Sequence, residues 1–120
     1  MTLPEVDPER LAKEWQGDQD VLGNLARSGD RPEIPRLVDV SFRGSDDDLE
    51  RLAEEASSFG FHVLEHEETE DGDPWLFLAR EQTADQASIK ALTLLCLQIE
   101  VMFDVEYDGW GCMAQTGLIH

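Results

Sequence analysis

Basic residues are scarce in this sequence: nine lysines and arginines stand against 27 aspartates and glutamates, and the formal net charge is −18. A chain with this balance repels the phosphates of nucleic acids and the surfaces of anionic membranes. Direct binding to RNA or DNA and attachment to a membrane are therefore disfavoured. The partner that the charge predicts is a basic protein surface, such as that of a protein that itself binds RNA.

Cysteine and histidine are also rare. The two cysteines, Cys96 and Cys112, have no spacing typical of a disulfide framework or a zinc site, and Cys96 lies in an apolar run typical of a core residue. His62 and His66 fall in one predicted strand, about 13 Å apart along it, which is too far for two ligands of one ion. We predict no cofactor, no metal site and no catalytic residue.

Long apolar runs and a leader pattern are missing as well. No stretch approaches the roughly 18 consecutive apolar residues of a membrane span, and the N-terminus has no charged segment followed by an apolar one. The prediction is a soluble cytoplasmic protein. A length of 120 residues favours one domain, and a hydrophobic share of 41% excludes a disordered chain.

Hydrophobic periodicity predicts three helices and four strands. In order they are a helix over residues 8–28, a strand over 37–43, a helix over 45–59, strands over 61–67 and 75–80, a helix over 84–102, and a last strand that begins at 103. The helix starts are predicted from capping residues: Asp7 before Pro8, Ser45, and Thr83 paired with Gln86 as a capping box.

The alternation of the second predicted strand assigns its faces. Phe61 and Val63 should face the core, and His62 and His66 should lie together on the outer face. This strand and the next should form a hairpin whose tightest point is Asp71-Gly72. The strand after the hairpin is apolar on both faces, which predicts an interior position in the sheet.

Without the first helix, the order of elements is strand, helix, strand, strand, helix, strand. This order predicts an α+β fold of the ferredoxin-like βαββαβ type, with an antiparallel four-stranded sheet, both helices on one face and an extra N-terminal helix. The first and third strands should be central, and the second and fourth should be edges. The predicted organisation is an N-terminal helix and linker over residues 1–35, the ferredoxin-like domain over 36–112 and a short tail over 113–120.

The last predicted helix has two apolar stripes. The stripe predicted to face the sheet comprises Ala91, Leu92, Leu95, Ile99 and Met102. The second stripe, nearly opposite, comprises Leu94, Leu97 and Val101. Two interpretations of the second stripe stay open: the N-terminal helix covers it, or it is a self-association surface of a homo-oligomer.

The stretch from Phe103 to Gly111 reads FDVEYDGWG and combines a strand pattern with a glycine-rich end. Its alternation places Phe103, Val105 and Tyr107 on an inner face and the carboxylates of Asp104, Glu106 and Asp108 on an outer one. The two glycines around Trp110 predict a turn or bulge that aims the indole at a defined target. That target is either the core, with Trp110 as a lid, or a partner protein.

The same stretch resembles the closing signature of the ribonuclease E regulator B family, the small acidic protein inhibitors of RNase E. Three shorter motifs resemble that family in the same order: Asp47-Asp48-Leu49, Gly60-Phe61-His62-Val63 and Glu70-Asp71-Gly72-Asp73. The resemblance covers about residues 37–111, and its last motif is the specific one. It implies a ferredoxin-like fold and a protein that binds the regulatory region of the endoribonuclease and lowers RNA turnover.

Charge, the lack of a catalytic constellation and the resemblance together favour a non-catalytic inhibitor that docks on a basic region of an RNA-processing endoribonuclease. The predicted partner-binding residues are Asp104, Glu106, Asp108 and Trp110, with Asp39 adding charge if its strand lies next to the last one. The alternative is an acidic interaction or immunity-type module of the same fold with a different basic protein partner. An enzyme that binds Mg²⁺ through the row of carboxylates is a third class, disfavoured because a second set of ligands is missing.

Overall fold

The computed structural model describes residues 3–68 and 74–115 of the chain. Its elements are α1 (Pro8–Arg27), β1 (Arg36–Arg43), α2 (Asp46–Glu55), a 3₁₀ turn η1 (Ala56–Phe59), β2 (His62–Glu68), β3 (Pro74–Gln82), α3 (Gln86–Phe103) and β4 (Glu106–Cys112). The predicted kinds and order of helices and strands are confirmed. The turn predicted at Asp71-Gly72 lies outside the described residues.

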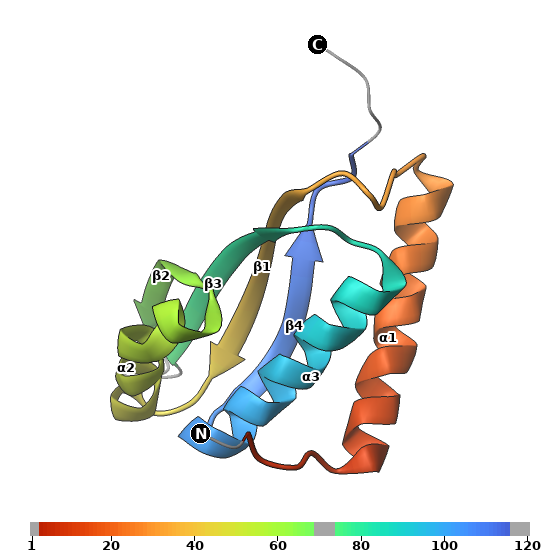
Figure 1. The fold of residues 1–120 in the computed structure, drawn as a ribbon. Helices are drawn as coiled ribbons and strands as arrows, with labels where there is room; N and C mark the ends of the chain where they lie inside the picture. The colour runs from red at the N-terminus through yellow and green to blue at the C-terminus, as the bar shows by residue number, and fades with distance from the viewer. Residues whose placement is uncertain (1–2, 69–73, 116–120) are drawn as a thin grey trace.

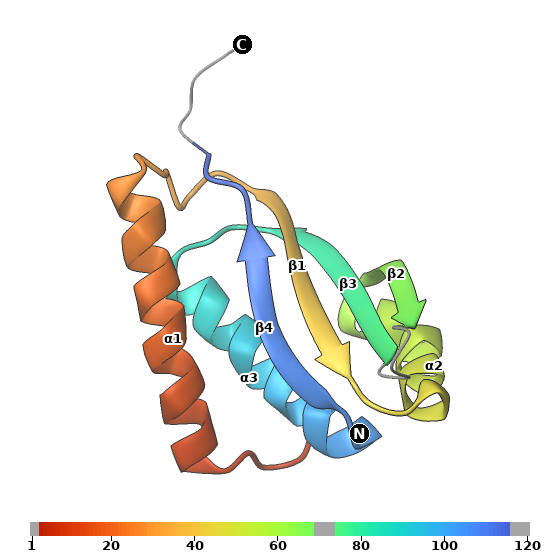
Figure 2. The ribbon, with the colours of Figure 1, turned by 180° about the vertical axis from the view of Figure 1, so that it is seen from behind.

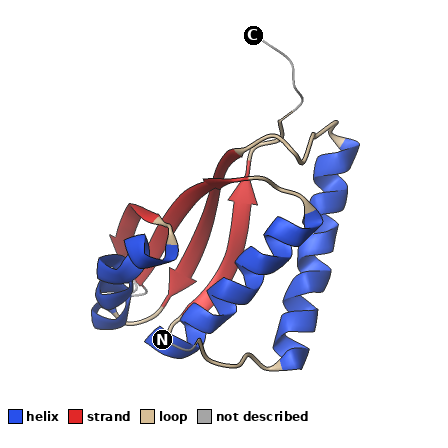
Figure 3. Cartoon of the chain, in the orientation of Figure 1, coloured by secondary structure: helices blue, strands red, loops and turns tan. Residues whose placement is uncertain are grey.

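The four strands form one antiparallel sheet in the order β2-β3-β1-β4. The central strands are β1 and β3, as the order of elements predicts. Helices α2 and α3 lie on one face of the sheet, and α1 lies alongside α3 on the side of β4 (Figures 1 and 3). The opposite face, called the open face below, carries no helix among the described segments (Figure 2).

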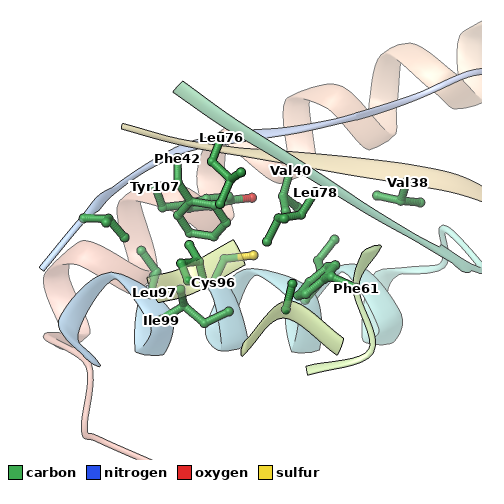
Figure 4. Packing of buried hydrophobic residues seen from close by; sticks show 14 of the residues in the cluster. Val38, Val40, Phe42, Phe61, Leu76, Leu78, Cys96, Leu97, Ile99 and Tyr107 are labelled. Carbon is green, nitrogen blue, oxygen red and sulfur yellow. The ribbon is translucent and has the colours of Figure 1, made fainter. Parts of the chain in front are cut away.

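The core fills the space between the sheet and the helices (Figure 4). Alternate residues of the central strands contribute to it, together with the apolar sides of α2 and α3. Its fully buried members include Val38, Val40 and Phe42 of β1, Leu76 and Leu78 of β3, Leu49 and Leu52 of α2, and Ile89, Leu92, Cys96, Leu97 and Ile99 of α3. The prediction that one face of β1 is buried is confirmed.

Two of the three predicted helix starts are confirmed. The carboxylate of Asp7 accepts the Glu9 N–H at the start of α1, and the hydroxyl of Ser45 accepts the Asp48 N–H at the start of α2. The helix that follows Ser45 tightens into the 3₁₀ turn before it ends at Gly60. This glycine has φ of 82°, which a residue with a side chain rarely adopts.

The predicted capping box at the start of α3 is wrong. The N-cap is Asp85, whose carboxylate accepts the N–H of Ser88 at 3.0 Å, and the hydroxyl of Thr83 donates to the same carboxylate. Thr83 therefore secures the cap and is not the cap itself. These hydrogen bonds, led by the one from Thr83, lower the pKa of Asp85 to about 2.

The predicted faces of β2 need correction because the strand contains an irregularity. His62 pairs with Ala79 and His66 with Leu76, since the register shifts between Val63 and Glu65. The extra residue places the two histidines on opposite faces of the sheet, so the prediction of one shared face is wrong. His66 Nε2 lies 3.5 Å from Asp46 Oδ1 at the start of α2.

Val63 also departs from its prediction. It lies opposite the buried Leu78, on the face that the helices cover, yet it is 44% exposed. The reason is its place on an edge strand, where neighbours flank it on one side only. The residue that enters the core from this region is Phe61, which precedes the strand and is buried as predicted.

The buried side of α3 is rotated relative to the prediction. Leu97 is 0% exposed and belongs to the core, so it is not available as a self-association surface. Leu94 and Val101 are 38% and 55% exposed, and α1 does not cover them. Ala91, predicted to face the sheet, is exposed. The cause is α1, which packs along α3 and covers the side that carries Thr93, whose hydroxyl donates to Asp18.

By length and composition alone, α3 also meets the requirements of a membrane span, contrary to the prediction that no stretch would. In this fold its buried residues pack in the core against the sheet and α1. A core helix covered on two sides needs an unusually wide apolar surface, and such a helix passes the same composition test.

Candidate protein-binding surface

The stretch that ends the described fold begins as a helix and not as a strand. Phe103 is the last residue of α3, and Asp104 follows as its C-cap with φ of 55°. Strand β4 starts only at Glu106. The prediction that the strand begins at Phe103 is therefore wrong, because an aspartate tolerates the left-handed conformation that ends a helix in one residue.

The predicted exposure of the three carboxylates is confirmed, but the predicted single row on one strand face is wrong, because Asp104 lies in the turn before β4 and Asp108 is the extra residue at a register shift. Val105 and Tyr107 are buried, and the three carboxylates of Asp104, Glu106 and Asp108, called the C-terminal carboxylates below, are exposed. Asp104 lies in the turn after α3, Glu106 opens β4, and both line a surface hollow that also includes Arg43. Burial of the apolar side leaves these charges in water.

The predicted bulge near the glycines is confirmed. Phe42 pairs with Tyr107 and Ser41 pairs with Gly109, so Asp108 is the extra residue in β4. Gly109 has φ of 120°, a conformation that a side chain would strain. The bulge places Trp110 opposite the buried Val40, on the face that the helices cover.

Trp110 is held by a hydrogen bond to a buried carboxylate of α1. Its indole Nε1 donates to Asp18 Oδ1 at 2.8 Å, and the hydroxyl of Thr93 on α3 donates to Oδ2 of the same side chain. Asp18 is 4% exposed. Burial raises the pKa of this carboxyl, against the two hydrogen bonds, which lower it. One residue thus joins α1, α3 and β4.

A second polar contact joins the same three elements. Glu100 Oε1 accepts a hydrogen bond from Arg10 Nη2 at 2.9 Å and from the backbone N–H of Tyr107 at 2.9 Å. Arg10 also donates to the carbonyl oxygen of Tyr107 at 3.3 Å. The start of β4, and with it the C-terminal carboxylates, is therefore positioned by α1 and α3.

Asp39 lies on the open face, beside β4 as predicted. It pairs with Gly111, and its carboxylate lies 3.4 Å from the place where a Cβ of residue 111 would stand. Glu106 lies on the same face, opposite Arg43. Asp39 and Arg43 are four residues apart along β1, so Asp39 is brought near the end of β4 and not near Asp104.

A comparison with protein families identifies the family of this chain. The model of the family described as "Regulator of ribonuclease activity B" matches residues 15–112. The chain belongs to this family. The match extends beyond the resemblance seen in the sequence, because it includes most of α1, whose Asp18 and Trp15 lie against α3.

Individual members of the regulator of ribonuclease activity B family are similar over most of their length. The protein of that name from Escherichia coli K12 is 32% identical over 112 residues, which are 88% of this chain and 80% of that protein. The one from Colwellia psychrerythraea is 32% identical, over 86% of this chain and 93% of the other. The one from Xenorhabdus nematophila is 27% identical, over 88% and 78%.

Metal-ligating side chains and cysteine thiols were the two kinds of reactive group to consider in the described part of this family member. Residues 3–68 and 74–115 contain no group of three or more metal-ligating side chains close enough to hold an ion. Burial raises the pKa of the Cys96 and Cys112 thiols, so neither cysteine is an activated nucleophile. The exposed carboxylates on and beside β4 are the candidate contacts that the described residues offer.

Asp18 and Glu100 are the residues that sequence analysis missed. A signal for Asp18 exists in hindsight: it continues the spacing of the apolar residues Leu11, Trp15, Leu22 and Leu25 along one side of α1. A carboxylate at such a position predicts a buried polar contact. No comparable signal identifies Glu100, since a helical glutamate is usually exposed.

Proposed function

We propose that this protein is a non-catalytic, soluble, cytoplasmic regulator that binds an RNA-processing endoribonuclease of the RNase E type and inhibits it. The observation that carries the proposal is membership in the regulator of ribonuclease activity B family over residues 15–112. A net charge of −18 supports a basic docking region on the enzyme, because RNA-binding surfaces are basic and attract such a protein.

The proposed contact residues are the C-terminal carboxylates together with Asp39. They are exposed or half-exposed, and they lie on or beside the paired strands β1 and β4. Charges of this kind accelerate the encounter of two proteins more than they strengthen the complex. Trp110 has its N–H bonded to Asp18, so we expect it to support the contact by holding β4 in place.

The test uses the intact ribonuclease and the full chain. Purified protein is added to the ribonuclease, direct binding is measured by calorimetry, and the cleavage rate of a fluorescent RNA is followed. We expect binding and a lower cleavage rate. A control without ribonuclease, in which the protein is mixed with the RNA alone, should show neither binding nor cleavage, since the chain repels phosphates.

The alternative, an acidic interaction or immunity-type module, predicts a different result in the same design. The ribonuclease would neither bind the protein nor be slowed by it. Affinity purification from an extract of the cell that produces the chain would then recover another single basic protein, and reconstitution with that protein would replace the ribonuclease in the assay.

A further inference from the structure

Two aromatic side chains stand next to each other on the open face of the sheet. Trp75 and Phe77 are alternate residues of the central strand β3, so they project from the same face, away from the buried Leu76. Their rings are stacked, with centroids 5.9 Å apart and planes 8° from parallel. No described helix covers this face (Figure 2), and both side chains are only partly buried. They are called the aromatic pair below.

Carboxylates flank the aromatic pair on the neighbouring strand. Glu67 of β2 lies opposite Trp75, and Glu65 lies opposite Phe77, so that each glutamate stands beside one ring on the same face. Glu65 and Glu67 are close enough that a hydrogen bond and the charge of Glu67 raise the pKa of Glu65. Two like charges that crowd each other in this way would be stabilised by a cation placed between them.

One guanidinium already uses this surface. Arg43 of β1 lies over the Trp75 ring, 4.6 Å from its centroid, on the side away from β2. A flat cation on an aromatic face is a favourable contact, and arginine makes it more often than lysine. The geometry of the open face therefore accepts a guanidinium on an aromatic ring, with carboxylates in the same row of the sheet.

We propose that the open face is a docking surface for an extended, arginine-rich segment of a partner protein, with guanidinium groups seated between the aromatic pair and the carboxylates of Glu65 and Glu67. This inference rests on the proposed function in one respect, since both require a basic partner. It differs in location: the contacts lie on β2 and β3, across β1 from the C-terminal carboxylates.

An extended segment matches the spacing of the surface. Alternate residues on one strand face are about 6.6–6.8 Å apart, so Glu65 and Glu67 stand at the interval of alternate side chains in an extended peptide. Arginine suits both neighbours, because its planar group stacks on a ring while its N–H groups point to a carboxylate. Bases of single-stranded RNA also stack on aromatic side chains, but the carboxylates repel the phosphates that such a strand brings.

The experiment uses a deca-arginine peptide as the probe and two charge-matched double variants. Glu65→Gln/Glu67→Gln removes two charges from the open face, and Glu50→Gln/Glu54→Gln removes two exposed charges from α2. We expect the open-face variant to raise the peptide Kd about fivefold or more, and the α2 variant about twofold or less, because only the former loses direct contacts. Equal effects of the two variants would overturn the proposal.

A second readout identifies the ring that the peptide meets. The three tryptophan indole N–H signals are followed by NMR during the titration. We expect the signal of Trp75 to shift with the peptide, while those of Trp15, covered by Lys90, and Trp110, bonded to Asp18, stay in place. An unmoved Trp75 signal, or a Trp75 shift produced equally by a single-stranded uridine oligonucleotide, would contradict the proposal.

The ribonuclease distinguishes this proposal from the proposed function. If the enzyme binds wild type and both double variants alike, the docking surface is wrong and the proposed function stands. If deca-arginine shifts Trp75 and discriminates the variants while the ribonuclease binds none of the proteins, the docking surface is right and the proposed function is wrong.

Discussion

Replacement of Asp18 should separate the role of its hydrogen bonds from the role of its charge. Asp18→Ala leaves the Trp110 N–H and the Thr93 hydroxyl without their acceptor in a buried site. An unsatisfied buried polar group costs about 1–3 kcal/mol, and part of that cost is offset by removal of a buried charge. We expect a net loss of about 2 kcal/mol, which at an m-value near 2 kcal/mol/M lowers the urea midpoint by about 1 M.

Asp18→Asn should behave differently. The amide oxygen can accept from Trp110, the amide nitrogen can donate to the Thr93 hydroxyl, and no charge is buried. Because burial raises the pKa of Asp18, the folded protein binds this proton more tightly than the unfolded chain does. The contribution of the carboxyl to stability is therefore greatest at low pH and is lost as the pH rises through the folded-state pKa. We expect Asp18→Asn to equal or exceed wild type at pH 7 and to lose that advantage toward pH 4.

The assay is urea unfolding followed by circular dichroism at both pH values, with Asp20→Ala as the matched control. Asp20 lies two residues along the same helix and is exposed, so its removal changes the net charge equally and breaks no buried contact. We expect it to leave the free energy of unfolding within about 0.5 kcal/mol of wild type. Equal destabilisation by Asp18→Ala and Asp20→Ala would refute the reasoning, as would an Asp18→Asn variant less stable than Asp18→Ala.

Three further outcomes test other parts of the structure. Conversion of the C-terminal carboxylates to their amides should lower the association rate with the ribonuclease about tenfold at low salt and weaken the salt dependence of that rate. The dissociation rate should change little. Unchanged association kinetics, measured by stopped flow, would show that docking occurs elsewhere. Leu97→Glu should lower the free energy of unfolding by more than about 4 kcal/mol or prevent folding, whereas Val101→Glu should change it by about 0.5 kcal/mol or less. Similar urea midpoints for the two variants would contradict the difference in burial. Asp85→Ala should cost about 1 kcal/mol at pH 7. Capping hydrogen bonds lower the pKa of Asp85 to about 2, so this stabilisation is present above the unfolded-state pKa and is lost as the pH falls toward 2. If wild type and Asp85→Ala still differed as much in melting temperature at pH 2 as at pH 7, the result would count against the cap.

The order of helices and strands could be predicted from the sequence because it depends on local signals. The alternation that buries Val38, Val40 and Phe42 repeats every two residues, and the caps at Asp7 and Ser45 act within one turn. These signals are independent of the rest of the chain. The central and edge positions of the strands then follow from the connections between them.

Features that depend on distant contacts were not predictable in the same way. The shift in β2 reflects how it pairs with β3, and the rotation of the buried side of α3 reflects the packing of α1. Competing local caps also misled the sequence analysis, since Thr83 and Asp85 are both suitable residues two positions apart. In each case the sequence offers two local solutions, and a tertiary contact selects one.

The candidate surface was predictable in its charges and not in its anchor. The exposure of Glu106 and Asp108 follows from alternation with buried neighbours. The direction of Trp110 depends on an acceptor on α1, Asp18, which lies 92 residues earlier in the chain. The glycines around Trp110 indicate that its indole has a fixed direction, but they do not identify the hydrogen-bond acceptor, which lies on a different helix.

The register shift in β2 also makes this edge of the sheet a poor template for a strand of a second molecule. Strand β2 is paired to β3 on one side, and a regular edge strand offers its free N–H and C=O groups to a strand of a second copy. The shift between Val63 and Glu65 interrupts that row, and the carboxylates of Glu65 and Glu67 repel the same residues of another molecule. Deletion of Leu64, the extra residue, would restore an even row and leave the residues that follow on their present faces. We expect the Leu64 deletion variant to form fibres more readily than the wild-type protein.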